Sequence, residues 1–247
     1  MAAPLAVLLA SALTTCLTGC GAAAPVASPA AAEQIVLQPL VGEVWVHTSF
    51  KTLPAWGRVP SNGLLICKPG QGTLVDTAFT PEQTTQLLQA AEAKGCPVQA
   101  AVLTHHHDDR MAGLPVLQAA GIPTLVRPQT VQLAKVSDWK PILLTDDAVV
   151  TPAGTTLQVY YPGAGHTVDN AVVWLPDYQL LFGGCLVRAL DNRALGNLQD
   201  ADVAAWPATI ARVLERYGTA VHVVPGHGAP GDAALLRHTA ELARVGR

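Results

Sequence analysis

The segment Thr104-His105-His106-His107-Asp108-Asp109-Arg110 decides how the rest of the sequence is interpreted. It follows residues 98–103, an apolar run with the length of a buried β-strand, and loops at strand ends are where ligands gather on α/β scaffolds. Alternate residues share a side in an extended or turning backbone, so His105, His107 and Asp109 are expected to converge on one point. Two imidazoles and a carboxylate suit zinc. The competing interpretation, a solvated polar loop, does not account for three adjacent histidines in a chain with only eight.

Three more potential ligands follow apolar runs further along the chain, each with a glycine shortly before it. They are His166 in Pro162-Gly163-Ala164-Gly165-His166-Thr167, Cys185 after Leu181-Phe182-Gly183-Gly184, and His227 in Val224-Pro225-Gly226-His227-Gly228. Taken singly, each is equally typical of a satisfied buried histidine, a small buried thiol or a loop histidine. Together with the histidine segment they provide four histidines, one aspartate and one cysteine, which suffices for two tetrahedral zinc ions sharing a water.

Strands and helices are expected to alternate around these ligands. The candidate strands are 35–40, 43–48, 63–68, 73–77, 98–103, 122–126, 156–161, 171–175, 179–182 and 220–224. A helix is expected after Thr80, with Pro81 in its first turn and Gln83 completing a capping box, and Gly95 ends it. Further helices are expected up to residue 120, after Pro128, over 202–216 and from residue 232. This order predicts an α/β fold with mixed sheets and helices outside them.

Residues 49–62 are expected to form a loop that carries Phe50 and Trp56. Apolar residues on a proline-containing loop either pack onto the core or form a flap over a ligand, and the local sequence does not decide between the two. The composition, with 50% hydrophobic and 13% charged residues, predicts a well-buried core. The formal net charge of −3 and the lack of a basic stripe make a nucleic-acid partner improbable.

The N-terminus predicts export from the cytoplasm. An apolar run over residues 5–17 ends in Leu17-Thr18-Gly19-Cys20, which resembles the lipobox of bacterial lipoproteins. We therefore expect a signal peptide over 1–19, a lipidated Cys20, an Ala/Pro-rich tether over 20–32 and a folded domain over 33–247. Gly21 resembles the residue of lipoproteins sorted to the outer membrane, facing the periplasm. An ordinary signal peptide with an incidental Cys20 is the alternative. In the domain, Cys67 and Cys96 are candidates for a disulfide, which the sequence leaves open.

The order of the motifs resembles the metallo-β-lactamase family, in its di-zinc subclass with a cysteine ligand. The shared motifs are His-x-His-x-Asp-Arg, Gly-His-Thr-x-Asp-Asn, Phe-Gly-Gly-Cys, Gly-Asn-Leu and Pro-Gly-His-Gly, and the resemblance runs from about residue 33 to the C-terminus. It implies the four-layered αβ/βα sandwich of two mixed sheets with outer helices. It also implies a monomeric β-lactamase that hydrolyses the amide bond of penicillins, cephalosporins and carbapenems and confers antibiotic resistance.

The resemblance assigns roles residue by residue. One zinc ion would be held by His105, His107 and His166, and a second by Asp109, Cys185 and His227. Asp109 would also orient the attacking hydroxide, Asn197 would help to polarise the lactam carbonyl, and Phe50 and Trp56 would belong to a flap over the substrate. Arg188 stands where family members often keep a lysine that binds the substrate carboxylate, and the two side chains are not equivalent.

Two other functions compete with this assignment. Thioesterases and lactonases on the same scaffold usually have a histidine directly after the motif aspartate and a bridging aspartate in place of the cysteine, whereas this chain has Arg110 and Cys185. A non-catalytic periplasmic zinc-binding protein would close each site with four protein ligands. This sequence offers three protein ligands for each of the two zinc ions, which leaves a coordination position for water at each.

Overall fold

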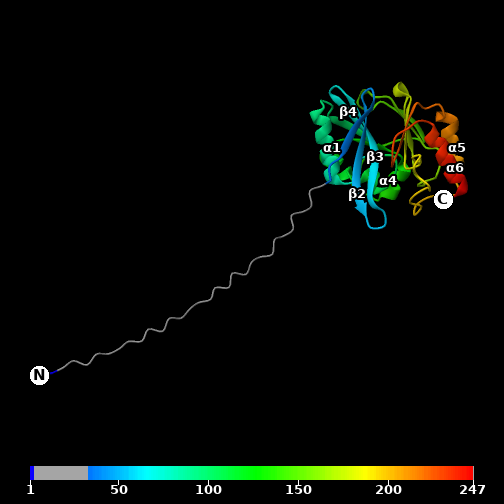
Figure 1. Ribbon diagram of the computed structural model, residues 1–247. Helices are drawn as coiled ribbons and strands as arrows, with labels where there is room; N and C mark the ends of the chain where they lie inside the picture. Colours follow the sequence, from blue (N-terminus) through cyan, green and yellow to red (C-terminus); the bar gives the residue numbers. More distant parts are fainter. Residues whose placement is uncertain (3–32, 247) are drawn as a thin grey trace. The chain divides into compact units, whose positions relative to one another are not determined.

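Two mixed β-sheets form the centre of this computed structural model, which describes residues 1–2 and 33–246 (Figure 1). The strands of the first sheet lie in the order β1 (Val36–Val41), β2 (Val44–Leu53), β3 (Gly57–Lys68), β4 (Gln71–Val75), β5 (Val98–Val102), β6 (Thr124–Val126) and β7 (Ile142–Leu143). The second sheet has the order β12 (His222–Pro225), β11 (Leu180–Gly184), β10 (Val172–Leu175), β9 (Leu157–Tyr160) and β8 (Asp147–Val150). Each sheet combines antiparallel and parallel pairs.

Helices cover the outer face of each sheet, so the chain forms four layers (Figure 1). They are α1 (Pro81–Ala93), α2 (Asp108–Met111), α3 (Leu114–Ala119), α4 (Pro128–Ala134), α5 (Trp206–Tyr217) and α6 (Ala234–Val245), with short 3-10 turns η1 (Pro152–Gly154) and η2 (Pro176–Tyr178). Of the four hydrophobic clusters in the described part of the chain, three hold the layers together. One lies between the sheets around Ile66 and Phe182, one under α1 around Leu87, and one under α5 and α6 around Trp206. The predicted αβ/βα sandwich is confirmed.

The largest difference from the sequence-based expectation lies at residues 49–62, where the predicted loop is a long β-hairpin. β2 continues to Leu53 and β3 begins at Gly57, with a paired register throughout. Pro60 of β3 is paired with Phe50 of β2. The N–H and C=O of Phe50 both point away from β3 and bind the side chain of Gln83, so β3 accommodates the proline. Phe50 and Pro60 therefore form a non-hydrogen-bonded pair, in which the missing proline N–H costs no ladder bond.

Other elements also differ from the prediction. β7 and β8, which are short strands at one edge of each sheet, were not predicted. The predicted helix over 202–216 begins later, at Trp206, and Asp202 caps the turn before α5 by accepting a hydrogen bond from the Ala205 N–H. The predicted capping box of α1 is half formed. Thr80 accepts from the Gln83 N–H, but the Gln83 side chain reaches Phe50 instead of Thr80.

Cys67 and Cys96 form a disulfide that ties β3 to the segment after α1. Cys185 is the free, buried cysteine of the described part of the chain. The predicted signal peptide over 1–19, the tether over 20–32 and Cys20 fall on residues 3–32, outside the described residues. Among the described helices, none has both the length and the hydropathy needed to cross a bilayer.

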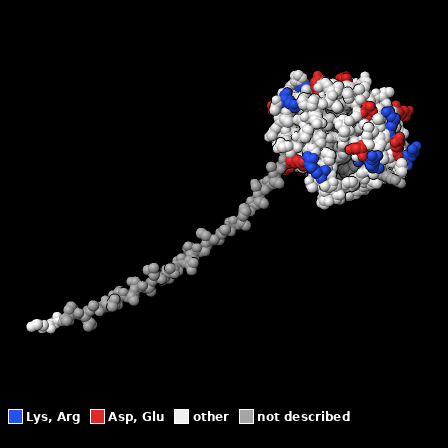
Figure 2. Space-filling model, in the orientation of Figure 1, with Lys and Arg blue, Asp and Glu red and all other residues white. Residues whose placement is uncertain are grey.

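Charged side chains of both signs are interspersed on the face drawn in Figure 2, with uncharged surface between them. This agrees with the formal net charge of −3 spread over 247 residues. Interspersed charges produce a weak field at a distance, so this face does not steer a charged partner from afar.

Candidate active site

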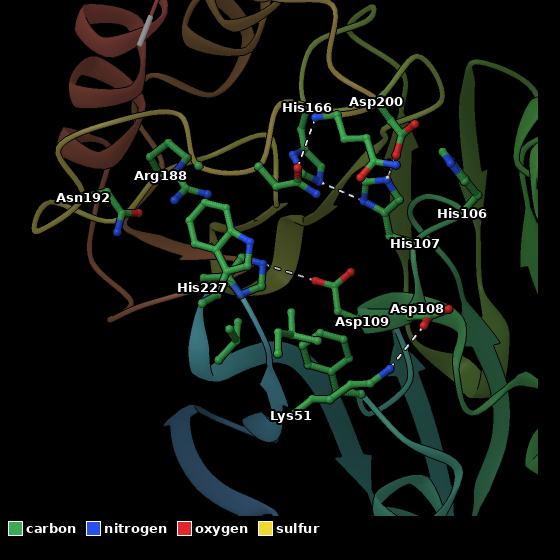
Figure 3. A pocket seen from close by; sticks show the side chains of 17 residues that line it. Lys51, His106, His107, Asp108, Asp109, His166, Arg188, Asn192, Asp200 and His227 are labelled. Carbon is green, nitrogen blue, oxygen red and sulfur yellow. Dashed lines mark hydrogen bonds and ion pairs between the residues drawn. The ribbon is translucent and has the colours of Figure 1, made fainter.

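The six sequence-predicted ligands meet at one edge of the two sheets, although they come from four separate chain segments. His105, His107 and Asp109 follow the end of β5, and His166 lies in the loop between β9 and β10. Cys185 directly follows β11, and His227 follows β12. Figure 3 shows His107, His166, Asp109 and His227 pointing into a common cleft. The strand ends therefore bring together residues that are more than one hundred positions apart in the sequence.

Three imidazoles form the first cluster, His105, His107 and His166. The ring centroids are 4.9 Å, 5.1 Å and 5.0 Å apart for the pairs 105–107, 105–166 and 107–166. The pKa of His105 lies well below its usual value because of burial and the neighbouring His166, and that of His166 is lowered by burial and His107. Both rings are thus neutral at physiological pH, and neutral imidazoles have the nitrogen lone pair that a metal needs.

Asp109, Cys185 and His227 form the second cluster, beside the first. The His227 Nε2 atom lies 3.2 Å from Asp109 Oδ2 and 3.3 Å from Cys185 Sγ. Burial alone would lower the pKa of His227, but Cys185 and Asp109 outweigh it and raise the pKa to about 10. The protonated Nε2 of His227 then points its positive charge at the Cys185 sulfur and the Asp109 carboxylate. A bound cation would neutralise the negative charge of the same two groups.

The donor set of the two clusters fits zinc. The Nε2 atom of His105 is buried and has no hydrogen-bond partner among residues 33–246, which is a costly arrangement unless a ligand takes up its lone pair. The ligand atoms of Asp109, Cys185 and His227 lie within 4.8 Å of one another, as do those of two groups that cross between the clusters, His105/His107/Asp109 and His105/His166/Cys185. The two sets therefore adjoin, and imidazole nitrogens, a sulfur and a carboxylate oxygen are the atoms that zinc prefers.

Arg110 supports the second cluster from below, a role that the sequence analysis did not assign. Its fully buried guanidinium donates to Asp109 Oδ2 at 2.7 Å, to Cys185 Sγ at 3.0 Å and to the Gly226 carbonyl at 3.1 Å. Burial would raise the pKa of Asp109, but Arg110 and His227 hold it well below the usual range. Asp109 is therefore ionised, and its orientation is set by a fixed hydrogen-bond partner.

Two further carboxylates hold the histidine segment in place. Asp200 lies 3.0 Å from Nε2 of His107, and Asp169 lies 2.9 Å from Nδ1 of His106. His106 thus turns away from the three-histidine cluster toward Asp169, as the alternation predicted. A carboxylate behind a metal-ligating histidine fixes its tautomer and ring orientation. Asp200 was missed because it lies 93 residues from His107 in the sequence.

Four members of the two clusters, His107, Asp109, His166 and His227, form the floor of a cleft of about 650 Å³. Leu53, Trp56 and Val59 of the β2–β3 hairpin line one wall, and Arg188, Asn192 and Asn197 line the opposite one. Trp56 is 59% exposed at the hairpin tip, so its ring is available to a ligand. This volume is within the range of sites for small organic molecules.

Arg188 is an unpaired cation beside this cleft. Burial lowers the pKa of its guanidinium, and the Nε atom has no hydrogen-bond partner among the described residues. No carboxylate of residues 33–246 forms an ion pair with it. A half-buried guanidinium that lines a cleft without an ion-pair partner among the described residues is a strong recognition group for an anion.

Of the predicted substrate contacts Asn197 and Phe50, only Asn197 lines the cleft. Asn197 lines the cleft, and its side-chain oxygen accepts from the Gln199 N–H in a local turn. Phe50, in contrast, is not among the described residues that line the cleft. Its ring packs against the Arg58 guanidinium at 3.7 Å, and its backbone is bound by Gln83. The side chain of Phe50 therefore supports the hairpin from behind.

Comparisons with known proteins agree with this geometry. A family model described as the metallo-beta-lactamase superfamily matches residues 56–227. Two relatives named metallo-beta-lactamase type 2 are similar: one from Bacillus cereus at 40% identity over 211 residues (84% of this chain, 82% of the relative), and one from Bacteroides fragilis at 36% over 215 residues (85% and 86%). The crystal structure of DIM-1 metallo-beta-lactamase exposed to ceftazidime has a TM-score of 0.82 at 36% identity, covering 87% of this chain and 99% of that one. The residues matched by the family model include strands β3 to β12 and all six candidate ligands.

Proposed function

The chain belongs to the metallo-beta-lactamase superfamily, and we propose that it is a zinc-dependent hydrolase that opens the amide bond of β-lactam antibiotics. The observation that carries the proposal is the convergence of six ligand side chains at a cleft whose wall contains Arg188, a cation without an ion-pair partner among residues 33–246. Penicillins, cephalosporins and carbapenems all combine an amide carbonyl with a nearby carboxylate, and the cleft offers a group for each.

We assign two zinc ions to each chain. His105, His107 and His166, whose rings lie next to one another, would hold one, and Asp109, Cys185 and His227 would hold the other. Each set has three protein ligands, which leaves room for solvent at both, and this is typical of catalytic sites. When bound, zinc supplies Lewis-acid chemistry that polarises a carbonyl and makes water nucleophilic at neutral pH.

The residues of the chain then bind and orient the reactants. Arg188 receives the substrate carboxylate, which places the lactam carbonyl above the floor of the cleft. Asn197 lies in the same wall and donates its amide N–H to the carbonyl oxygen as negative charge develops there. Oδ2 of Asp109 is held by Arg110 and His227, so its other oxygen is free to orient the attacking water. The water oxygen bonds to the carbonyl carbon and the C–N bond breaks. One proton of the water passes to the leaving nitrogen, and the other is released to solvent as the new carboxyl group ionises.

A chelation experiment tests this function. Removal of metal with a chelator is expected to abolish hydrolysis of the chromogenic cephalosporin nitrocefin, and added zinc is expected to restore it. Thioester and lactone substrates, assayed in parallel, test the other hydrolases on this scaffold. Full nitrocefin hydrolysis by metal-free protein would refute the proposal, and preference for thioesters or lactones would replace the substrate class.

We also propose that the enzyme acts as a monomer in the periplasm, anchored to the outer membrane through a lipid on Cys20. The Cys67–Cys96 disulfide supports an oxidising compartment. The lipobox-like Leu17-Thr18-Gly19-Cys20 supports the anchor. Metabolic labelling with a fatty acid tests it: the wild type is expected to incorporate label and Cys20→Ala is not. Label in both proteins, or in neither, would contradict lipidation at Cys20.

A further inference from the structure

The outer edge of the β2–β3 hairpin is not covered by another strand of residues 33–246. β1 pairs with β2 only as far as the Val36–Thr48 partners, whereas β3 stays paired with β2 to Leu53 and Gly57. Residues 49–53 of β2 therefore extend beyond β1. Among the described strands, none binds the backbone N–H and C=O groups that these residues direct away from β3. An uncovered strand of this kind needs other partners if it is to keep one position.

Side chains and backbone around the start of α1 provide these partners. The buried amide of Gln83 makes two hydrogen bonds to one residue: its Oε1 accepts from the Phe50 N–H at 2.8 Å, and its Nε2 donates to the Phe50 carbonyl at 2.6 Å. Next to it, the Phe79 N–H donates to Ser49 Oγ at 2.9 Å. The Gln83 amide thus replaces a neighbouring strand, because it offers one acceptor and one donor with similar spacing.

The neighbouring strand of the hairpin contacts His227, one of the proposed metal ligands. Phe50 is paired with Pro60 across β2 and β3, and the Pro60 carbonyl lies 2.6 Å from His227 Nδ1. A continuous set of contacts therefore joins Gln83, the Phe50–Pro60 pair and His227. Beyond this point, the hairpin tip carries Leu53 and Trp56 over the cleft.

We propose that Gln83 is a positioning residue that fixes the base of the hairpin, so that only the tip moves when a substrate enters. This inference rests on the proposed function, since it concerns substrate binding in the same cleft. With Gln83 in place, Leu53 and Trp56 approach the substrate from a fixed pivot, and binding needs little ordering of the hairpin. Without Gln83, residues 49–53 lose conformational freedom each time a substrate binds. This entropy cost raises KM more than it lowers kcat.

The test compares Gln83→Leu with Gln86→Leu in the zinc-loaded protein. Gln86 is the matched control, because it lies on the same helix and also binds a backbone group by its side chain, accepting from the Ile35 N–H at 3.1 Å. Hydrogen exchange at the Phe50 amide is followed by NMR, and nitrocefin kinetics are measured alongside. Exchange needs no substrate, so its outcome stands even if the protein does not hydrolyse β-lactams.

Gln83→Leu is expected to speed exchange at Phe50 about tenfold or more and to raise KM about fivefold, with kcat within about twofold of wild type. Gln86→Leu is expected to leave both Phe50 exchange and KM unchanged. Unchanged exchange at Phe50 in Gln83→Leu would overturn the proposal, as would a fall in kcat with KM unchanged. Should Gln83→Leu not fold, Gln83→Glu retains the acceptor for the Phe50 N–H and is expected to be intermediate; wild-type exchange and KM in that variant would equally overturn it.

Discussion

Removal of the Cys67–Cys96 disulfide is expected to lower the stability of the domain without changing its catalysis. The two cysteines are 29 residues apart in the sequence, and closing a loop of this size removes about 3.6 kcal/mol of chain entropy from the unfolded state at 25 °C in the chain-entropy model. For a domain of about 200 residues, this corresponds to a fall in Tm of about 7–14 °C. The disulfide lies at the end of β3 opposite the hairpin, so the cleft should keep its geometry.

The assay is thermal and urea unfolding of wild type and Cys67→Ala/Cys96→Ala, both zinc-loaded, with nitrocefin kinetics as the control. This double variant leaves Cys185 in place, so zinc binding and unfolding are separated. A fall in Tm of less than about 2 °C would refute the entropy argument, because it corresponds to under 1 kcal/mol. A wild-type protein purified from the periplasm with both thiols free would refute the disulfide itself.

Three other predictions follow from individual side chains. Cys185→Ala is expected to weaken the binding of one zinc ion per chain and to spare the other, because Cys185 contacts Asp109 and His227; two tightly bound zinc ions by mass spectrometry would show that the ligand assignment is wrong. Arg188→Ala is expected to raise KM about tenfold with a smaller change in kcat, and Arg188→Lys to recover part of the loss, because the proposed role of this cation is to bind the substrate carboxylate. An unchanged KM would remove Arg188 from substrate binding. His47 is fully buried, and burial lowers its pKa to about 4. Because this lies below the ordinary value of 6.5, His47 contributes stability that is fully present above pH 6.5 and is lost as the pH falls toward 4, by about 3 kcal/mol at most. In urea unfolding, His47→Gln is expected to lose less stability over this range than wild type, and an identical pH dependence in both proteins would contradict this origin.

The fold class was predictable from the sequence because the order of strand and helix signals along the chain matches the order of elements in the two sheets. Apolar runs bounded by glycine and proline marked most strands, and the capping residues Thr80 and Pro81 marked the start of α1. The prediction failed at residues 49–62, where proline suggested a loop. The deciding factor there is a non-local partner, since Gln83 takes the outward hydrogen bonds of Phe50 and makes Pro60 harmless in β3.

The candidate ligands were also predictable, because alternation after a strand separates His105 and His107 from His106. Their supports were not. Arg110 entered the sequence analysis as part of a motif, whereas its buried contacts with Cys185 and Gly226 join segments that are 75 and 116 residues away. Contacts over such distances depend on the packing of the two sheets, and no local pattern in the chain encodes them.

Titration of metal-free protein with cobalt tests most directly whether one metal site contains the Cys185 sulfur. The account predicts that two cobalt ions bind per chain, that a sulfur-to-cobalt charge-transfer absorption accompanies binding, and that Cys185→Ala lacks this absorption while still binding one ion. Two bound ions without the absorption in the wild type, or the same absorption in Cys185→Ala, would contradict it.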